Sequence, residues 1–232
     1  MAKIKISPSL LNEWASLLNG DYEEWGKDES DIVDYILGDY QPNAAVSKGS
    51  AVHLMLEHGV DQYEDHSEET EFLTYKVYEE DFDHTWTFTW EAVEPIHKLR
   101  QSLEGGIFEP WNNFEFDCLG YRIRMNMRHD YLRGIKLHEF KTSKNAKKYV
   151  DYLHSYQMKS YFLACPDVAQ ITYHCFQVPD EPKKDGIIRW SRYQRFEYLR
   201  TGDEFEEVES MTRSLLKFIK SDRRLLQKLT IS

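Results

Sequence analysis

The stretch YRIRMNMRHDYLRGIKLHEFK, residues 121–141, decides the fold that we predict for this chain. Apolar and polar residues alternate through its first part, 121–128, which is typical of a half-buried strand. Gly134 then turns the chain into a second strand over 135–141. Alternation places the odd positions of this second strand on one face. The two strands therefore predict an antiparallel hairpin.

The shared face of the second strand begins apolar and ends with the charged side chains of Glu139 and Lys141. Burying these charges for structure alone would be costly, so the strand must deliver them to a polar cleft or pair them. Asp130 lies at the end of the preceding strand, nine residues before Glu139 and across the Gly134 turn. We therefore expect the two carboxylates to lie side by side.

Paired carboxylates indicate a cation site, because two close carboxylates repel each other unless a cation lies between them. Oxygen-rich sites of this kind suit Mg²⁺ or Mn²⁺. A lysine beside them, here Lys141, can orient the attacking water or stabilise charge on a phosphate. The pattern ExK is common by chance, so the structural alternative is a surface Asp130 with an ordinary Glu139–Lys141 pair.

The charge distribution bears on the substrate. The net charge of −11 argues against a polyanion, because phosphate contacts need lysine and arginine. Residues 122–148 nevertheless hold nine basic and two acidic residues, a net of +7, which leaves −18 on the rest of the chain. A localised positive stripe can attract nucleic acid at one place, although a solvated charged face has the same composition. The two acids inside the stripe, Asp130 and Glu139, favour the first interpretation.

Basic residues of this stripe are candidates for DNA contact. Arg122, Arg124 and Arg128 share even positions with Asp130, so alternation predicts that they line the approach to it. Three lysines should flank this approach from the start of the next predicted helix, and they are Lys144, Lys147 and Lys148.

The flanking sequence predicts an α/β fold. Ser7 and Pro8 predict the cap and first turn of a helix that ends near Leu18. Residues 57–94 are strongly acidic and are expected to be helical in part, as a specificity lobe, a DNA-mimicking surface or a solvated helix face. No Gly-rich phosphate loop is present, so a P-loop nucleotide hydrolase is unsupported. Further helices are expected over 30–37, 47–58, 146–163 and 204–229, and a further strand over 170–177.

Two of the predicted helices carry polar rows. Gly49, His53 and Glu57 fall at i, i+4 and i+8 on an otherwise largely apolar helix, where a lone histidine is commonly structural. Gln157 and Tyr161 are likewise at i and i+4 in the helix after the second strand, and by themselves they form an ordinary polar row.

Taken together and in this order, these residues resemble the motifs of the PD-(D/E)XK nuclease superfamily, and within it the RecB-like and RecE-like exonuclease branch. That branch has GxxxH on a helix, then Asp, then ExK, then QxxxY, which read here as Gly49–His53, Asp130, Glu139–Lys141 and Gln157–Tyr161. The start Ile6–Leu11 and the segment Phe140–Ser143 also resemble the branch. The resemblance covers about residues 6–178, and four motifs in order are far more specific than any one of them.

The resemblance implies a restriction-endonuclease-like α/β core, with a mixed central β-sheet flanked by helices, in a single domain over 1–232. We expect an added helical, acidic insertion at about 60–108 and a long C-terminal helix at about 204–229.

The resemblance also implies the roles of the site residues. The metal, Mg²⁺ or Mn²⁺, would be held by His53, Asp130, Glu139 and the carbonyl of Phe140. Lys141 would be the catalytic lysine, and Gln157 and Tyr161 would support the site and contact DNA. The expected catalytic residues are thus Asp130, Glu139, Lys141, Gln157 and Tyr161.

The cysteines and the apolar runs bear on cofactors and location. Cys118, Cys165 and Cys175 are an odd number without CxxC spacing, so we expect neither a disulfide framework nor a zinc site. Relatives with an iron–sulfur cluster use four cysteines, so no iron–sulfur cluster is expected. No apolar run reaches the ~18–20 residues that span a bilayer, and the start lacks the apolar region of a secretory signal. We therefore expect no membrane partner and a cytoplasmic location, in the host cytoplasm if the protein is phage-encoded.

The expected function is a metal-dependent deoxyribonuclease. By analogy with the branch, it would be an exonuclease acting from DNA ends in recombination, repair or phage replication. The alternatives are a structure-specific or sequence-specific endonuclease with the same site, a catalytically inactive nuclease fold that binds DNA or protein, and an acidic interaction protein. The expected partner is DNA, with a second copy of the chain or a recombination or replication protein as further candidates.

Overall fold

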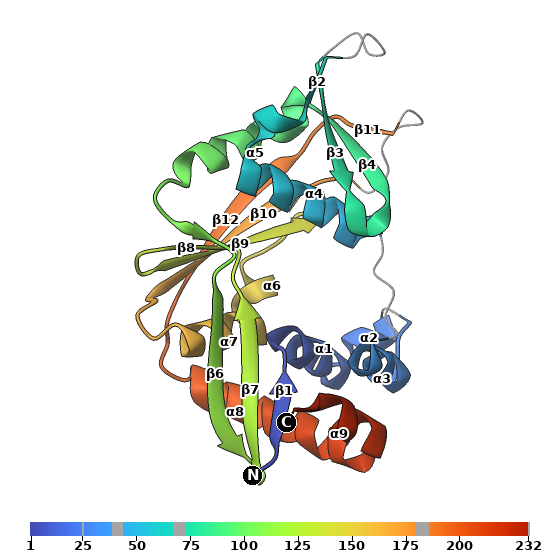
Figure 1. Ribbon diagram of the computed structural model, residues 1–232, viewed down its shortest axis with the longest axis vertical. Coiled ribbons are helices and arrows are strands. Elements are labelled where there is room, and N and C mark those ends of the chain that lie inside the picture. The colour runs from blue at the N-terminus through green and yellow to red at the C-terminus, as the bar shows by residue number, and fades with distance from the viewer. Residues whose placement is uncertain (25, 39–43, 67–72, 180–185, 232) are drawn as a thin grey trace.

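The computed structural model describes residues 1–24, 26–38, 44–66, 73–179 and 186–231, and its strands form three sheets flanked by helices (Figure 1). Each sheet contains both parallel and antiparallel neighbours. The predicted α/β class, with mixed β-structure flanked by helices, is confirmed.

The helical elements have the following bounds: α1 (Pro8–Leu18), α2 (Asp21–Glu24), α3 (Glu29–Leu37), α4 (Ala44–His58), η1 (Val60–Tyr63), η2 (Glu80–Phe82), α5 (Trp90–Ser102), α6 (Val150–Leu153), α7 (Tyr156–Ala164), α8 (Glu204–Ser221) and α9 (Arg223–Leu229). The strands are β1 (Lys3–Ile6), β2 (Glu64–Asp65), β3 (Thr74–Glu79), β4 (His84–Thr89), β5 (Ile107–Phe108), β6 (Trp111–Cys118), β7 (Tyr121–Arg128), β8 (Tyr131–Arg133), β9 (Lys136–Ser143), β10 (Gln170–Gln177), β11 (Ile187–Ile188), β12 (Arg192–Leu199) and β13 (Thr230–Ile231).

The three sheets have different strand orders. The terminal sheet has the order β13-β1-β7-β6, and it brings the two ends of the described chain together. The central sheet has the order β12-β10-β9-β8-β5, with β9 and β10 parallel. The distal sheet has the order β11-β4-β3-β2 and lies at the top of the view in Figure 1.

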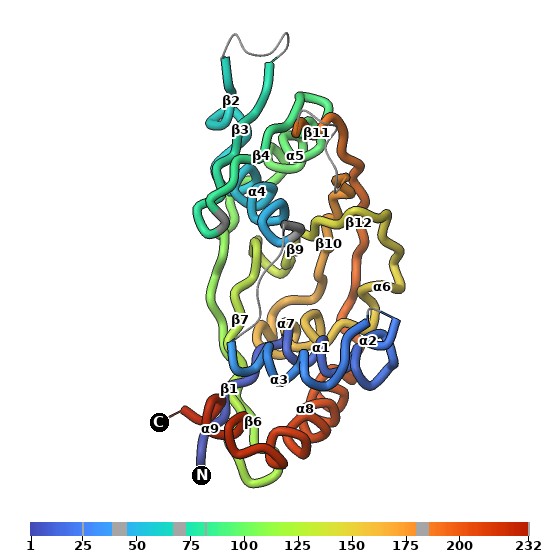
Figure 2. Tube along the Cα trace, turned by 90° about the vertical axis from the view of Figure 1, so that its right-hand side faces the viewer, coloured from blue at the N-terminus to red at the C-terminus, as the bar shows by residue number. Residues whose placement is uncertain are grey.

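Two hydrophobic cores lie on opposite faces of the central sheet. Leu137 and Ile171 belong to a core that includes buried residues of α1, α7 and α8. Phe140 and Phe176 belong to a second core, formed with α4, α5 and the distal sheet. Alternate positions of β9 and β10 thus enter different cores, as strand pleating requires. The helices of the first core occupy the lower half of the molecule and those of the second the upper half in both views (Figures 1 and 2).

Local sequence signals account for the helix that opens the chain. The hydroxyl of Ser7 accepts a hydrogen bond from the Leu10 N–H at 3.1 Å, and Pro8 occupies the first helical turn, where no donor is needed. The predicted helix that ends at Leu18 is confirmed as α1.

Several other predicted elements are confirmed. The helices over 30–37 and 47–58 are observed as α3 and α4, each beginning slightly earlier. The strands over 121–128 and 170–177 are β7 and β10 with the same bounds, and the strand predicted over 135–141 is β9. The predicted hairpin between these two strands is wrong: β7 pairs with β1 and β6 in the terminal sheet, and the antiparallel partner of β9 across the Gly134 turn is the short strand β8.

The prediction of a helical insertion at about 60–108 is wrong for much of its length. Between the short η1 and α5, the strands β3 and β4 form a hairpin over residues 74–89 that is connected by η2. Tyr75 and Val77 of β3 and Trp86 and Phe88 of β4 alternate with more polar residues and are buried in the second core. The prediction followed the acidic composition and overlooked this alternation of apolar and polar residues. The acidic residues Glu68, Glu69 and Glu71 lie outside the described residues.

Two predicted helices are each divided. The C-terminal helix over 204–229 breaks at Asp222, whose backbone is extended and whose carboxylate accepts from the Arg224 N–H to begin α9. The helix over 146–163 is divided into α6 and α7, because Ser155 between them has an extended backbone. Within the described residues, no helix is long and apolar enough to cross a bilayer.

Candidate active site

Asp130 and Glu139 lie side by side where β8 joins β9. Tyr131 pairs with His138 in the antiparallel β8–β9 register, so Asp130 comes next to Glu139. The Asp130 N–H donates to Glu139 Oε1 at 3.4 Å, and Asp130 Oδ2 accepts the Phe140 N–H at 2.6 Å. The β8–β9 hairpin, and not a pairing of β7 with β9, therefore brings the two carboxylates together.

Glu139 is almost fully buried, with 1% of its side chain exposed, and Lys141 Nζ lies 3.1 Å from its Oε2. Burial first, and the charge of Asp130 second, raise the pKa of Glu139 to about 8. Burial alone would lower the pKa of Lys141, yet the Glu139 and Asp130 carboxylates raise it, so the lysine stays a cation. Two carboxyl groups thus lie beside one ammonium in a largely buried place, and a bound cation would favour the ionised form of Glu139.

Helix α7 presents Gln157 and Tyr161 to this cluster. Lys141 Nζ donates to Gln157 Oε1 at 3.2 Å, and Gln157 Nε2 donates to the Tyr161 hydroxyl at 2.6 Å. Tyr161 is buried, and its ring packs edge-on against His129 with the ring centres 4.4 Å apart. The polar row at i and i+4 therefore faces the lysine of the ExK motif and restricts where its ammonium can lie.

His53 approaches the same carboxylates from α4, a helix of the second core. Its Nε2 lies 3.1 Å from the Phe140 carbonyl oxygen, and its Nδ1 lies 3.7 Å from Asp130 Oδ1. A third of its side chain, 34%, is exposed. His53 is therefore not a fully enclosed core histidine. It brings α4, which packs in the second core, into contact with a cluster that α7 of the first core also contacts.

The donor set fits Mg²⁺ or Mn²⁺ in kind, because carboxylate and carbonyl oxygens are the ligands that these cations prefer. The Phe140 carbonyl oxygen and His53 Nε2, 3.1 Å apart, have about the spacing of adjacent ligands around an octahedral cation with ~2.1 Å bonds. Within the described residues, no three His, Cys, Asp or Glu side chains converge closely enough to form a complete site by themselves. Mg²⁺ usually keeps several water ligands, so an incomplete protein set is compatible with it.

The three predicted arginines have ionic partners other than Asp130 and Glu139. They lie on the terminal sheet, and each is paired with an acid of β6 or of the segment just before it. These pairs are Arg122–Asp117 at 2.6 Å, Arg124–Glu115 at 3.7 Å and Arg128–Glu109 at 3.3 Å.

The expectation that these arginines line the approach to Asp130 is wrong for Arg122 and Arg124, because they lie along a strand of the terminal sheet and not of the central sheet. Arg128 is the last residue of β7, two positions before Asp130, and its place in the approach stays a prediction. β7 ends there, and by Tyr131 the chain has joined the central sheet. At ~3.3 Å per residue, up to roughly 25 Å of chain separates Arg122 from Asp130. A shared even-numbered position therefore does not bring Arg122 or Arg124 to Asp130.

The three predicted lysines lie in the segment between β9 and α6, and not on a helix as predicted. Lys144, Lys147 and Lys148 follow the end of β9 that carries Lys141, and Lys144 and Lys148 are exposed. Their place beside the site and their contact with DNA stay predictions.

Two neighbours of the site were not indicated by any local sequence pattern. Tyr173 of β10 is the register partner of Glu139, is fully buried, and has its ring centre 5.8 Å from Lys141 Nζ. Asn12 of α1 contacts the first turn of α7, accepting the Tyr156 N–H at 2.7 Å. Both placements depend on pairings between distant segments, which local periodicity does not encode.

A polar pocket of about 290 Å³ opens beside Lys141 and Gln157. Its other walls are Asn12 and Ser16 of α1 and the turn that precedes α7. This pocket gives the cluster access to solvent on the side of the first core.

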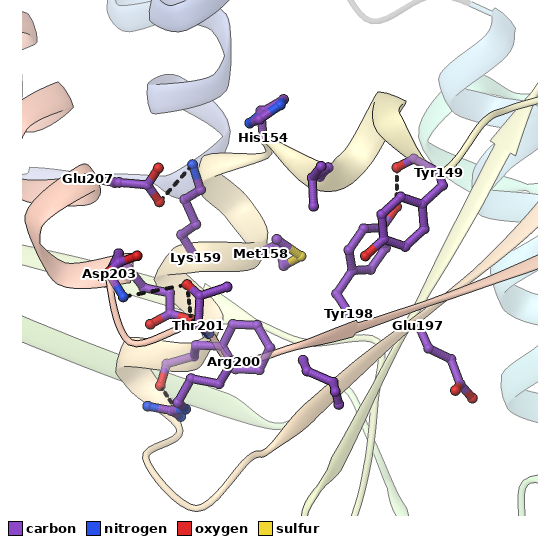
Figure 3. A pocket seen from close by; sticks show the side chains of 14 residues that line it. Tyr149, His154, Met158, Lys159, Glu197, Tyr198, Arg200, Thr201, Asp203 and Glu207 are labelled. Carbon is purple, nitrogen blue, oxygen red and sulfur yellow. Dashed lines mark hydrogen bonds and ion pairs between the residues drawn. The ribbon is translucent and has the colours of Figure 1, made fainter.

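A larger pocket of about 530 Å³ is separate from the carboxylates and is drawn in Figure 3. It is lined by Met158 of α7, by the end of β12 and by the start of α8. Three of its charged groups have partners within the chain: Lys159 lies 2.9 Å from Glu207, and Glu204 accepts the N–H groups of Thr201 and Gly202 just before α8. We therefore place the chemistry at the smaller pocket.

Comparison with known proteins does not assign a family. The sequence matches no family model and no curated protein. Among solved structures, a protein of Eubacterium rectale described as a "putative exonuclease" is 11% identical, with 97% of this chain and 80% of that chain covered and a TM-score of 0.44. A protein named SSO0001 is 17% identical, with 56% of this chain covered and a TM-score of 0.39, and the match spans 58% of its length, less than two thirds. Both likenesses are too weak to carry an argument.

Proposed function

We propose that this protein is a metal-dependent nuclease that hydrolyses phosphodiester bonds in DNA. The observation that carries the proposal is the meeting of Asp130, Glu139, Lys141 and the Phe140 carbonyl at one edge of β9, with His53 beside them. These residues come from separate segments of the chain, and together they form a cation site next to a fixed ammonium. An ordinary surface Glu–Lys pair would not be buried to 1% exposure at the carboxylate.

The chemistry divides among the residues in a definite way. Asp130, Glu139, the Phe140 carbonyl and His53 would hold Mg²⁺ or Mn²⁺, which supplies an activated water and neutralises charge on the phosphate when bound. Lys141 holds a permanent positive charge at the position where charge develops on the phosphate. Because the ammonium is already held by Glu139 and Gln157, little reorganisation is needed when a substrate arrives.

DNA is the substrate that the charge distribution favours. The site itself holds two carboxylates, yet the segment that follows β9 carries Lys144, Lys147 and Lys148. Cations at that position can hold phosphates flanking the scissile bond without occupying the site. Action from DNA ends, in recombination, repair or phage replication, follows from the resemblance to the RecB-like and RecE-like branch.

The test uses end-labelled linear, circular and single-stranded DNA, each with Mn²⁺, with Mg²⁺ and with chelator. An exonuclease degrades the linear substrates and leaves the covalently closed circle intact. Cleavage of the circle would instead identify an endonuclease with the same site.

Two variants make this test specific. Asp130→Ala should abolish cleavage, whereas Asp117→Ala, which removes an exposed carboxylate from the terminal sheet, should leave the rate unchanged. Chelator-resistant cleavage, or full activity of Asp130→Ala, would refute the proposed site. If the wild type binds DNA and cleaves none of the substrates, the chain is a binding module.

A further inference from the structure

Helix α7 begins without a cap of its own. The first N–H groups of a helix have no partner within it and need acceptors from elsewhere. Ser155 occupies the N-cap position of α7, where a serine side chain usually accepts one of these N–H groups. Its side chain makes no such hydrogen bond here. The acceptor for this turn must come from another part of the chain.

Asn12 of α1 supplies that acceptor. Its Oδ1 accepts the Tyr156 N–H at 2.7 Å and lies 3.4 Å from the Gln157 N–H, while its Nδ2 donates to the Ser155 hydroxyl at 3.3 Å. Backbone N–H groups can only donate, so these contacts also determine the orientation of the Asn12 amide. A residue 143 positions away in the sequence from Ser155 thus caps the helix that begins next to it.

The capped turn is the one that carries Gln157. The backbone of Gln157 is held next to Asn12, and its side chain accepts from Lys141 Nζ at 3.2 Å. A line of contacts therefore runs from Asn12 through the first turn of α7 to the ammonium beside Glu139. Asn12, Ser155, Gln157 and Lys141 also line the pocket of about 290 Å³ described above.

We infer that Asn12 is a positioning residue, which acts through Gln157 to hold Lys141 where the proposed cleavage needs it. This inference rests on the nuclease function proposed above. Loss of the acceptor leaves the first turn of α7 free to fray, and displacement of about 1 Å at a catalytic group can cost on the order of a hundredfold in rate. Substitution of a residue that only orients a catalytic or metal-binding side chain commonly lowers activity or metal affinity by roughly tenfold or more. Asn12 does not touch the reacting atoms, so its removal should act on turnover and not on DNA affinity.

The principal variant is Asn12→Leu, which has a similar size and no acceptor. We expect kcat at saturating DNA to fall roughly tenfold, with KM for DNA changed less than twofold. Asn12→Asp keeps an oxygen that accepts N–H groups at a helix N-terminus, where negative charge is favourable, and should recover most of kcat. An unchanged kcat in Asn12→Leu, or an equal loss in Asn12→Asp, would overturn the inference.

Ser7→Ala is the matched control, because it removes the N-cap of α1 itself. It should lower the melting temperature and leave kcat unchanged. If Ser7→Ala lowers kcat as much as Asn12→Leu, the effect of Asn12 is general destabilisation of α1 and the positioning role is excluded.

A double-mutant cycle of Asn12 with Gln157 distinguishes a positioning role of Asn12 from a general packing effect. In a Gln157→Ala background the line of contacts is already broken, so adding Asn12→Leu should cause less than a twofold further loss of kcat. An additional loss as large as in the wild-type background would show that Asn12 acts elsewhere.

Hydrogen exchange tests the cap without any cleavage. The Tyr156 amide should exchange at least about tenfold faster in Asn12→Leu than in wild type, and should be protected again in Asn12→Asp. Unchanged exchange at this amide would refute the cap itself. A wild type that does not cleave DNA, with this exchange pattern intact, would refute the nuclease function and the positioning role while leaving the cap in place.

Discussion

Glu139 and Lys141 stand two positions apart on β9 with Oε2 and Nζ separated by 3.1 Å, so one strand face carries a buried carboxylate and the ammonium that offsets it. Gln157 contacts the same ammonium from α7. The charge of the lysine is therefore held in one place by two partners on different elements. This arrangement makes the contribution of each residue separable by substitution.

Lys141→Ala should retain most DNA and metal affinity and lose turnover, because the ammonium is needed mainly where charge develops in the transition state. We expect kcat at saturating DNA to fall by about a hundredfold or more. Single-turnover cleavage and DNA titration on the same preparation measure the two effects. Lys136→Ala, on the same strand and outside the site, should cleave normally. Wild-type turnover in Lys141→Ala would mean that the site does not work as proposed.

Glu139→Ala should lose metal binding. In the wild type, Mn²⁺ at a hundredfold its dissociation constant should raise the free energy of unfolding by about 2.7 kcal/mol through mass action. Calorimetric titration and thermal unfolding with and without Mn²⁺ measure this. Glu115→Ala, which removes a surface carboxylate of β6, should behave as the wild type. Equal Mn²⁺ affinity in Glu139→Ala and the wild type would remove Glu139 from the site.

His53→Ala should strongly reduce cleavage while leaving the melting temperature nearly unchanged, because the side chain is one third exposed and lies against Asp130 and the Phe140 carbonyl. A structural histidine would give the reverse result, with a lower melting temperature and normal specific activity. Circular dichroism melts and cleavage rates on one purified variant distinguish the two cases.

The basic residues should differ in their effect on DNA binding. Arg122→Ala should change affinity little, because its guanidinium is already paired with Asp117 far from the carboxylates. Lys148→Ala should weaken binding and reduce the slope of log affinity against log salt by about one unit for the lost phosphate contact. Fluorescence anisotropy over a range of salt concentrations measures both slopes. A larger slope change for Arg122→Ala than for Lys148→Ala would move the DNA path onto the terminal sheet.

Gly106→Ala should destabilise the strand that leads out of the site. A Cβ at Gly106 would lie 2.3 Å from the Tyr131 ring and 2.6 Å from the Leu132 carbonyl oxygen, so β8 would have to shift. Overpacking of this kind costs about 1–3 kcal/mol. Because Tyr131 follows Asp130 directly, cleavage should fall together with the midpoint of urea unfolding. An unchanged midpoint would show that β8 accommodates the methyl group.

Much of the local structure could be predicted from the sequence because its causes are local. The Ser7 cap and Pro8 determine where α1 begins, and the alternation over 121–128 corresponds to β7 residue for residue. The Gly134 turn sets the β8–β9 register and so brings Asp130 to Glu139. Turn geometry and strand pleating act over a few residues, and a sequence shows them directly.

The acidic region 57–94 shows where composition misleads. Its charge predicted a solvated helix, yet β3 and β4 form a hairpin whose apolar faces are buried against α4 and α5. Charged residues on one face of a strand do not prevent the other face from entering a core. Apolar and polar residues alternate over 74–79 and 84–89 in the sequence, but the prediction was based on the net charge of the region.

The sequence by itself determined which side chains could do chemistry and the strand that carries two of them; the tertiary structure alone decided which others join them. His53 reaches Phe140 because α4 packs on the second core, while Arg122 is taken up by Asp117 of a neighbouring strand. Asn12 caps a helix that begins 144 residues later. Contacts of this kind arise when distant segments pack together. The free energy of that packing depends on the whole core, so no periodic pattern in the sequence predicts it.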